Sequence, residues 1–259
     1  MRETTLTEQS PAPKRPRKTT TRTGATSRPR TRKTGPVLDG GNPTFYDRFY
    51  AGSGFRYQED RERAFVRGVL IPAAGWVPGD RVIEIGAGKC LHARLLAEAG
   101  MDITAVEVSA AGVDYAKARY PNLDVQCADA AQWTTDRPGH VYARGLSWYH
   151  YELTGPGERN SRGVDVHACT ERVMRDLVAP GCCMVMQIVS DLTGRHPVTE
   201  PDLTGENPPD RRVHQSTVAE FEALFAPFGQ VTITDWAGQP IVPGKRHDRG
   251  VLVVTRRAG

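Results

Sequence analysis

Short apolar runs alternate with segments of helical periodicity along most of the chain. The first run, Val82-Ile83-Glu84-Ile85, consists mainly of β-branched residues, as is typical of a strand buried in a parallel sheet. Gly86 and Gly88 then allow the chain to turn, and Leu91 and Leu95, four residues apart, begin a helix. This stretch therefore predicts a strand, a glycine turn and a helix in direct succession.

The same alternation continues towards the C-terminus and indicates the fold class. Strands that alternate with helices predict an α/β protein with a doubly wound, Rossmann-like parallel sheet and helices on both faces. The other expected strands are 102–108, 123–127, 140–145, 182–189, 231–236 and 250–255, and the expected helices between them are 109–118, 165–178 and 216–225.

Residues 1–42 differ from the rest of the chain in composition. They are rich in Thr, Arg, Pro, Lys and Ser and hold almost no large apolar residues, so we expect a disordered tail before one domain at 43–259. Residues 1–40 hold ten basic and three acidic residues, a net charge of +7, whereas the remainder holds 24 basic and 27 acidic residues, a net charge of −3. The basic run at 14–18 leaves three interpretations open: nucleic-acid contact, an address signal, or a solvated tail without a specific partner.

Two further segments fall outside the alternation of strands and helices. Aromatic residues at helical spacing, among them Tyr46 and Tyr50, lie in an N-terminal helical cap at 43–75. This cap either packs on the sheet or covers a ligand, with the two tyrosines reaching its polar groups. Residues 192–212 are rich in Gly and Pro and predict a long loop, which is either a functional lid or a disordered insertion.

The cysteine content and the hydropathy pattern indicate the compartment. The five cysteines include no CxxC pair, so we expect reduced thiols, as in a cytoplasmic protein. The chain shows no apolar core of a signal peptide and no run of about 18 apolar residues, so we expect no membrane span. The pattern gives no indication of the oligomeric state.

Carboxylates lie at or near the C-terminal ends of three expected strands: Glu84, Glu107 and Asp129. Because parallel strands joined by right-handed crossovers end at the same edge, these acids and the glycine turn should line one ligand site. A dinucleotide site needs the pattern G-x-G-x-x-G, but Leu91 occupies the third glycine position, and a pyrophosphate does not call for Asp129. The pattern therefore argues against a dinucleotide.

These motifs resemble those of the class I S-adenosylmethionine-dependent methyltransferases, over about residues 45–190. Residues 82–88 are similar to the family's first motif, Glu107 to the acid that binds both ribose hydroxyls, and Asp129 to the acid beside the adenine amino group. One departure is Cys90, which stands where the family often has a third glycine. The resemblance implies a seven-stranded, mostly parallel sheet whose last strand is antiparallel, with S-adenosylmethionine as the cofactor. The cofactor-binding residues it implies are Glu84, Gly86, Ala87, Gly88, Glu107, Val108, Asp129, Ala130 and Gly145.

The methyl acceptor should approach over 145–151, where an aromatic cluster follows the fourth strand. His150 is the first candidate for a general base, because histidine titrates near neutral pH, and His196 is the second. We expect no metal site, because no carboxylate cluster lies near strands four and five. The Asn/Asp-Pro-Pro-aromatic motif of many nucleic-acid amino methyltransferases is also absent, which favours a small-molecule acceptor. The candidate catalytic residues are His150, His196 and Tyr149, and the candidate substrate-binding residues are Trp148, Tyr151, Tyr46 and Tyr50.

These observations favour an enzyme that methylates a small molecule at oxygen or nitrogen. Two alternatives stay open: an RNA or protein methyltransferase that docks through its basic tail, and a non-catalytic module that senses the cofactor. In the enzyme, methyl transfer would be an in-line displacement in which alignment of the two reactants does much of the work.

Overall fold

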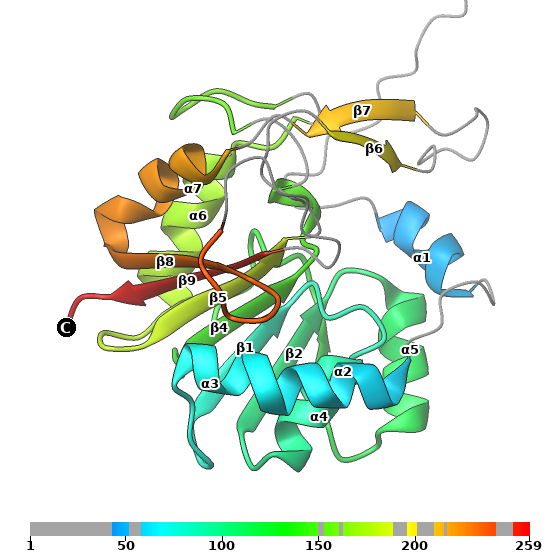
Figure 1. Ribbon diagram of the computed structural model, residues 1–259. Helices are drawn as coiled ribbons and strands as arrows, with labels where there is room; N and C mark the ends of the chain where they lie inside the picture. The colour runs from blue at the N-terminus through cyan, green and yellow to red at the C-terminus, as the bar shows by residue number, and fades with distance from the viewer. Residues whose placement is uncertain are drawn as a thin grey trace, which may run out of the picture. The chain divides into compact units, whose positions relative to one another are not determined.

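A computed structural model of the chain shows a seven-stranded sheet (Figure 1). It describes residues 43–51, 58–149, 153–160, 163–188, 196–200, 210–214, 217–241 and 251–259, with the side chains of 43–45, 196–200 and 210–214 left out, and the expected tail at 1–42 lies outside this range. The strands of the main sheet are β1 (Arg81–Ile85), β2 (Asp102–Glu107), β3 (Asp124–Cys127), β4 (His140–Arg144), β5 (Cys183–Ile188), β8 (Gly229–Asp235) and β9 (Val251–Arg257).

The strand order is β3-β2-β1-β4-β5-β9-β8, and β1 to β5 run parallel to their neighbours. Only β9 is antiparallel to the strands on both of its sides. The C-terminal ends of β3, β2, β1 and β4 therefore lie in this order along one edge of the sheet. The predicted fold class, with its antiparallel last strand, is confirmed.

Helices cover both faces of the sheet, and alternate residues of each strand supply the two cores. Val82 of β1 packs with α2 to α5, whereas Ile83 and Ile85 pack with α6 and α7, because successive side chains of a strand point to opposite faces. The helical segments are α1 (Pro43–Ala51), α2 (Glu59–Phe65), η1 (Val66–Leu70), α3 (Ile71–Ala74), α4 (Leu91–Glu98), α5 (Ala110–Arg119), η2 (Ser147–Tyr149), α6 (Val166–Arg172), η3 (Val173–Leu177), α7 (Val218–Phe225) and η4 (Ala226–Phe228).

The segment at 192–212, expected to be a loop, contains two strands. The backbone forms β6 (His196–Glu200) and β7 (Asp210–His214), which pair antiparallel as a separate two-stranded sheet. Both strands contain β-branched residues, which favour extended backbone. The part of the segment between them lies outside the described residues, so its role as a lid stays a prediction.

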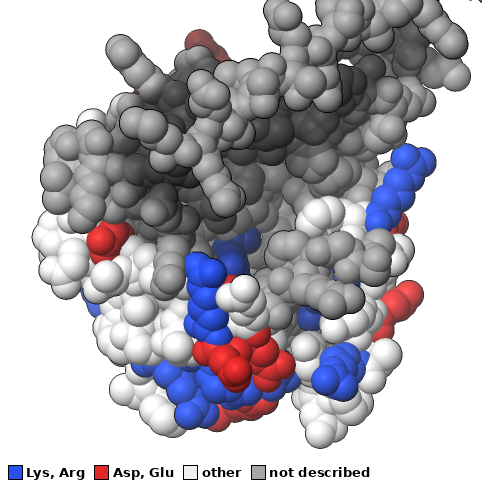
Figure 2. Space-filling view, turned by 45° about the vertical axis from the view of Figure 1, so that its right-hand side comes forward, with Lys and Arg blue, Asp and Glu red and all other residues white. Residues whose placement is uncertain are grey.

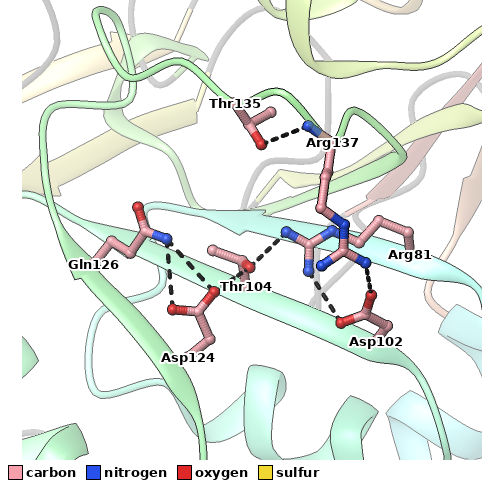
Figure 3. A network of polar contacts seen from close by, with 7 residues as sticks. All are labelled: Arg81, Asp102, Thr104, Asp124, Gln126, Thr135 and Arg137. Carbon is pink, nitrogen blue, oxygen red and sulfur yellow. Dashed lines mark hydrogen bonds and ion pairs between the residues drawn. The ribbon is translucent and has the colours of Figure 1, made fainter.

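A polar network connects the N-terminal ends of β1, β2 and β3, at the edge of the sheet opposite the glycine turn (Figure 3). Arg81 donates hydrogen bonds to Asp102 (3.2 Å) and to Thr104 (2.6 Å), and Arg137 donates to Asp102 (2.5 Å). Thr104 in turn donates to Asp124 (2.5 Å). The network thus joins three parallel strands through side chains that are partly in contact with solvent.

The exposed face of α2 and α4 carries ions of both signs. Arg63 and Arg94 each pair with Glu59 and Glu98. Basic and acidic side chains accordingly lie next to each other in the lower part of Figure 2. Opposite charges in contact leave this face without a patch of a single sign. Among the described helices, none has the length and apolar character required to cross a bilayer.

Candidate cofactor and acceptor site

An open cleft of about 480 Å³ lies at the C-terminal ends of β3, β2, β1 and β4. Each of the four strand ends contributes to its lining, and so does α1. The lining residues are Tyr46, Tyr50, Gly86, Glu107, Val108, Ala128, Asp129, Ala130, Arg144, Gly145, Leu146 and Ser147.

Glu107, the last residue of β2, holds its carboxylate in place through backbone donors. The N–H of Gly88 donates to one oxygen (2.7 Å) and the N–H of Ser109 to the other (2.9 Å). The residue is only 3% exposed, and burial raises the pKa of this carboxyl against the opposing effect of the two hydrogen bonds. A carboxylate has about four acceptor positions, so Glu107 retains capacity for ligand hydroxyls in the cleft.

The glycine turn after β1 is held mainly by its own backbone. Gly86 has φ 65°, a left-handed conformation that glycine adopts without steric cost, and it lines the cleft. Ala87 N–H donates to the carbonyl of Val106 (3.1 Å), and Cys90 N–H donates to the carbonyl of Ala87 (2.8 Å). Cys90 itself has φ 56°, which explains why glycine suits this position and why the cysteine strains the backbone there.

At the end of β3, Asp129 and Ala130 form the next part of the wall. One carboxylate oxygen of Asp129 accepts a hydrogen bond from the N–H of Ala131 (2.9 Å), in a turn closed by the side chain. This local bond fixes the aspartate at the rim of the cleft while its residue stays partly exposed.

Helix α1 closes one side of the cleft with two stacked tyrosines, Tyr46 and Tyr50, whose ring centroids lie 6.1 Å apart. A Cβ atom at Gly88 would lie 2.6 Å from the Tyr50 hydroxyl, so the absence of a side chain at Gly88 makes room for this ring. Asp47 attaches α1 to the first turn of α5: it accepts hydrogen bonds from the Ser109 hydroxyl (2.7 Å) and the Ala111 N–H (3.1 Å). These two bonds lower the pKa of the Asp47 carboxyl.

A group of three ionisable residues, the Arg144 cluster, supports the cleft at the end of β4. It consists of Glu62 on α2, His92 on α4 and Arg144 on β4. Arg144 donates to both oxygens of Glu62, at 2.7 and 3.1 Å, and one of its nitrogens lies 2.8 Å from His92 Nε2. Although burial opposes it, the hydrogen bond from His92 and the charge of Arg144 lower the pKa of Glu62 to about 2. Burial lowers the pKa of His92, so Glu62 and Arg144 carry the charges of the cluster at neutral pH.

Comparisons with known proteins agree with this geometry. A family model described as "Methyltransferase domain" matches residues 83–138, the segment that contains the glycine turn, Glu107 and Asp129. Over these residues the chain is therefore similar to methyltransferase domains. Residues 83–138 run from within β1 to just before β4 and so include three of the four strand ends that line the cleft.

Solved methyltransferases share the fold of this domain at low sequence identity. The CcbJ methyltransferase from Streptomyces caelestis has a TM-score of 0.59 and 15% identity, covering 83% of this chain and 98% of that one. The N-methyltransferase NodS from Bradyrhizobium japonicum WM9, in complex with S-adenosyl-L-homocysteine, has a TM-score of 0.55 and 13% identity, covering 83% and 99%.

One curated relative matches over a short segment. A demethylmenaquinone methyltransferase from Renibacterium salmoninarum is 34% identical over 64 residues, which is 25% of this chain. The match spans about a quarter of that protein's own length, 27%. The similarity therefore extends over only a part of the methyltransferase.

The described residues fit the methyl donor of this family, S-adenosylmethionine. Glu107 offers a fixed carboxylate to hydroxyl groups, and Asp129 lies one strand further along the same wall. Of the predicted cofactor-binding and substrate-binding residues, the cleft brings together Tyr46, Tyr50, Gly86, Glu107, Val108, Asp129, Ala130 and Gly145.

Three predicted cofactor residues lie beside the cleft instead of lining it. Ala87 is buried, and the N–H groups of Ala87 and Gly88 donate within the protein. Glu84 is 3% exposed and accepts a hydrogen bond from the N–H of Ala93 in the first turn of α4. Its burial raises the pKa to about 8, and its Oε2 atom has no hydrogen-bond partner among the described residues.

The predicted roles of Trp148 and Tyr149 at the acceptor are wrong, because both side chains point into the core. Trp148 is 0% and Tyr149 1% exposed. The Tyr149 hydroxyl shares a hydrogen bond with the hydroxyl of Thr170 (3.0 Å), and its ring lies against Phe221 and Phe225. Burial raises the pKa of Tyr149 further above its usual range, so this hydroxyl is held as a neutral core group.

The other predicted acceptor residues fall outside what the structure describes. His150 and Tyr151 follow η2 directly and are not described, and at His196 only the backbone is described, at the start of β6. Their roles stay predictions. Ser147 of η2, two positions before Tyr149, does line the cleft.

Sequence reasoning missed Glu62, His92 and Arg144. Two signals were present: Glu62 lies three and four residues before Phe65 and Val66, on the apolar side of its helix, and Arg144 ends a buried strand. A charged residue in such a position usually has a buried partner. The sequence could not identify that partner, because 82 residues separate Glu62 from Arg144.

Proposed function

We propose that the protein transfers the methyl group of S-adenosylmethionine to an oxygen or nitrogen atom of a small molecule, without a metal ion. The observation that carries this proposal is the order of groups along one cleft: Asp129 at the end of β3, Glu107 at the end of β2, Gly86 after β1 and Gly145 after β4. In this proposal Asp129 would meet the amino group of the adenosine, and Glu107 its ribose hydroxyls.

The described residues would act by binding the cofactor and by orienting its methyl group towards the acceptor. When bound, the cofactor supplies a methyl group on a positively charged sulfur, which is already reactive towards a nucleophile. Glu107 would accept hydrogen bonds from both ribose hydroxyls, and charge-assisted bonds of this kind are short and directional. Tyr46 and Tyr50 would cover the ligand from α1. The methyl acceptor would approach from the other side, along Gly145 to Ser147.

The binding part of the proposal can be tested with Glu107→Gln. We expect the affinity for S-adenosylhomocysteine, measured by titration calorimetry, to fall about 100-fold, because two charge-assisted hydrogen bonds of about 1.5 kcal/mol each are weakened. Asp102→Asn is the matched control, since Asp102 begins the same strand at the far edge of the sheet and should leave the affinity unchanged. Equal affinities of the wild type and Glu107→Gln would remove Glu107 from the site.

The acceptor can be sought by measuring S-adenosylhomocysteine release over a panel of amines, phenols, carboxylates and quinols. The panel is broad because two similar proteins are named for different acceptor chemistry, one an N-methyltransferase and one a demethylmenaquinone methyltransferase. His150 is our proposed base for a protonated nucleophile. Binding of the cofactor without turnover on any acceptor would favour the sensing module instead.

A further inference from the structure

Residues 129–133, the Asp129 turn, follow β3 and are held by a side chain of α6. Arg172, the last residue of α6, donates a hydrogen bond to the carbonyl of Ala130 (2.9 Å) and another to the carbonyl of Trp133. We propose that Arg172 is a positioning residue, which fixes this turn so that Asp129 meets the amino group of the donor's adenine and selects for that base. This inference rests on the proposed function, because it takes S-adenosylmethionine to be the ligand of the cleft.

The first argument is that the Asp129 turn moves as one unit. The N–H groups of Gln132 and Trp133 both donate to the carbonyl of Asp129, at 2.9 and 2.8 Å. The carboxylate of Asp129 accepts from the N–H of Ala131 (2.9 Å). Asp129 and Ala130 line the cleft, while the carbonyls of Ala130 and Trp133 accept from the guanidinium on α6. A shift of the turn would therefore displace the carboxylate in the cleft.

The second argument is where the Asp129 turn lies in the chain. Residues 128–139, all of them described, join β3 to β4 without a helix or a strand. Connections of this kind take several conformations unless other parts of the protein restrict them. Trp133 Nε1 ties one point of the connection to Gln126 of β3 (2.8 Å). Arg172 ties two more, at carbonyls three positions apart, and both belong to the turn that carries Asp129.

The third argument is that α6 gives the guanidinium a firm base. The helix buries Val166, Cys169 and Thr170 against the sheet, so its last residue starts from a fixed backbone. The planar fork of arginine can donate to two carbonyls at once, whereas the single ammonium of lysine lacks this geometry. Arg172→Lys would thus keep the positive charge at the end of the helix and lose the double hold on the turn.

The chemical consequence concerns the base of the ligand. An ionised carboxylate accepts hydrogen bonds and donates none. The amino group of adenine donates, whereas the carbonyl that replaces it in hypoxanthine accepts, so a carboxylate held in place favours adenine and disfavours hypoxanthine. A carboxylate that can move away from the base loses this preference. Arg172 should accordingly affect the choice of base and not the binding of the ribose at Glu107.

The test compares two ligands by titration calorimetry, S-adenosylhomocysteine and S-inosylhomocysteine, in which a carbonyl replaces the amino group of the base. We expect the wild type to prefer the adenosyl ligand about 30-fold. Arg172→Lys should lower the affinity for S-adenosylhomocysteine about tenfold and that for S-inosylhomocysteine less than about twofold. Arg175→Lys is the matched control, since Arg175 is 61% exposed and pairs with Asp176 at the surface, and it should change neither affinity.

A second comparison asks whether Arg172 acts through Asp129. In an Asp129→Ala background, Arg172→Lys should lower the affinity for S-adenosylhomocysteine less than about twofold, because the group that it positions is already absent. Arg172→Gln serves if Arg172→Lys fails to fold, since its amide can still donate to one carbonyl. It should show the same selective loss.

Three results in the variants would overturn the role of Arg172: an equal loss for both ligands, no loss for S-adenosylhomocysteine, or an undiminished loss in the Asp129→Ala background. A wild type that binds both ligands equally would also overturn it, while the binding of the methyl donor would stand. If the wild type binds neither ligand, the proposed function itself fails, and the role of Arg172 with it.

Discussion

The two ends of β2 carry carboxylates in opposite surroundings. Asp102, at the N-terminal end, has 43% of its side chain exposed and is bonded by the side chains of Arg81 and Arg137 (Figure 3). Glu107, at the C-terminal end, is 3% exposed and is bonded by backbone N–H groups. Long side chains and water can rearrange around Asp102, whereas the backbone fixes Glu107 in a single position. The difference shows how one strand can supply a solvated rim at one end and a rigidly held carboxylate at the other.

The ion pairs at the two edges differ in the same way. Arg137 is 63% exposed, and pairs of this kind contribute roughly 0–1 kcal/mol to stability. Arg144 pairs with Glu62, whose side chain is 9% exposed and which also contacts the buried His92. Removing one partner of a buried pair leaves the other charge without compensation, which costs far more than the pair itself contributes. Variants at the two edges should therefore differ clearly in how much they lower the free energy of unfolding.

The largest effect is expected for Glu62→Ala. It leaves Arg144 and His92 without their carboxylate, so the free energy of unfolding in urea should fall by about 3 kcal/mol. Glu59→Ala is the matched control one turn earlier in α2, where the side chain is 49% exposed, and it should cost about 0.5 kcal/mol. Similar losses in the two variants would mean that the Arg144 cluster is solvated like the surface.

An intermediate effect is expected for Glu84→Gln, in the way that the free energy of unfolding depends on pH. Because burial raises the pKa of Glu84 to about 8 in the folded protein, the folded state holds a proton that the unfolded state releases near pH 4.5. This group therefore makes the wild type less stable as the pH rises from about 5 to about 8. Urea unfolding at pH 5, 6.5 and 8 should show a weaker decline in the variant. An identical decline of stability with pH in both proteins would mean that the Glu84 carboxyl has an ordinary pKa in the folded protein.

The smallest effect is expected for Arg137→Ala. Its guanidinium bonds Asp102 from the surface, where Arg81 bonds the same carboxylate. The free energy of unfolding should change by less than about 0.5 kcal/mol, and the affinity for S-adenosylhomocysteine should stay the same. A loss above 1 kcal/mol, or any loss of ligand affinity, would show that the two edges of the sheet are coupled.

The sequence by itself determined the fold class and the acids of the cleft wall. Runs such as Val82–Ile85 and the helical spacing of Leu91 and Leu95 are local, so their periodicity indicates strand and helix without knowledge of the partners. Glu107 and Asp129 followed from the same reasoning, because a parallel sheet brings the ends of its strands to one edge whatever the details of packing.

Only the tertiary structure decided which way the remaining side chains point. Trp148 and Tyr149 follow a strand that ends in the cleft, but they turn into the core of α6 and α7. The amides of the glycine turn are used by β2, and Glu62, His92 and Arg144 meet from three distant segments. Contacts of this kind depend on the packing of whole elements against each other, which no local pattern of hydrophobic and polar residues encodes.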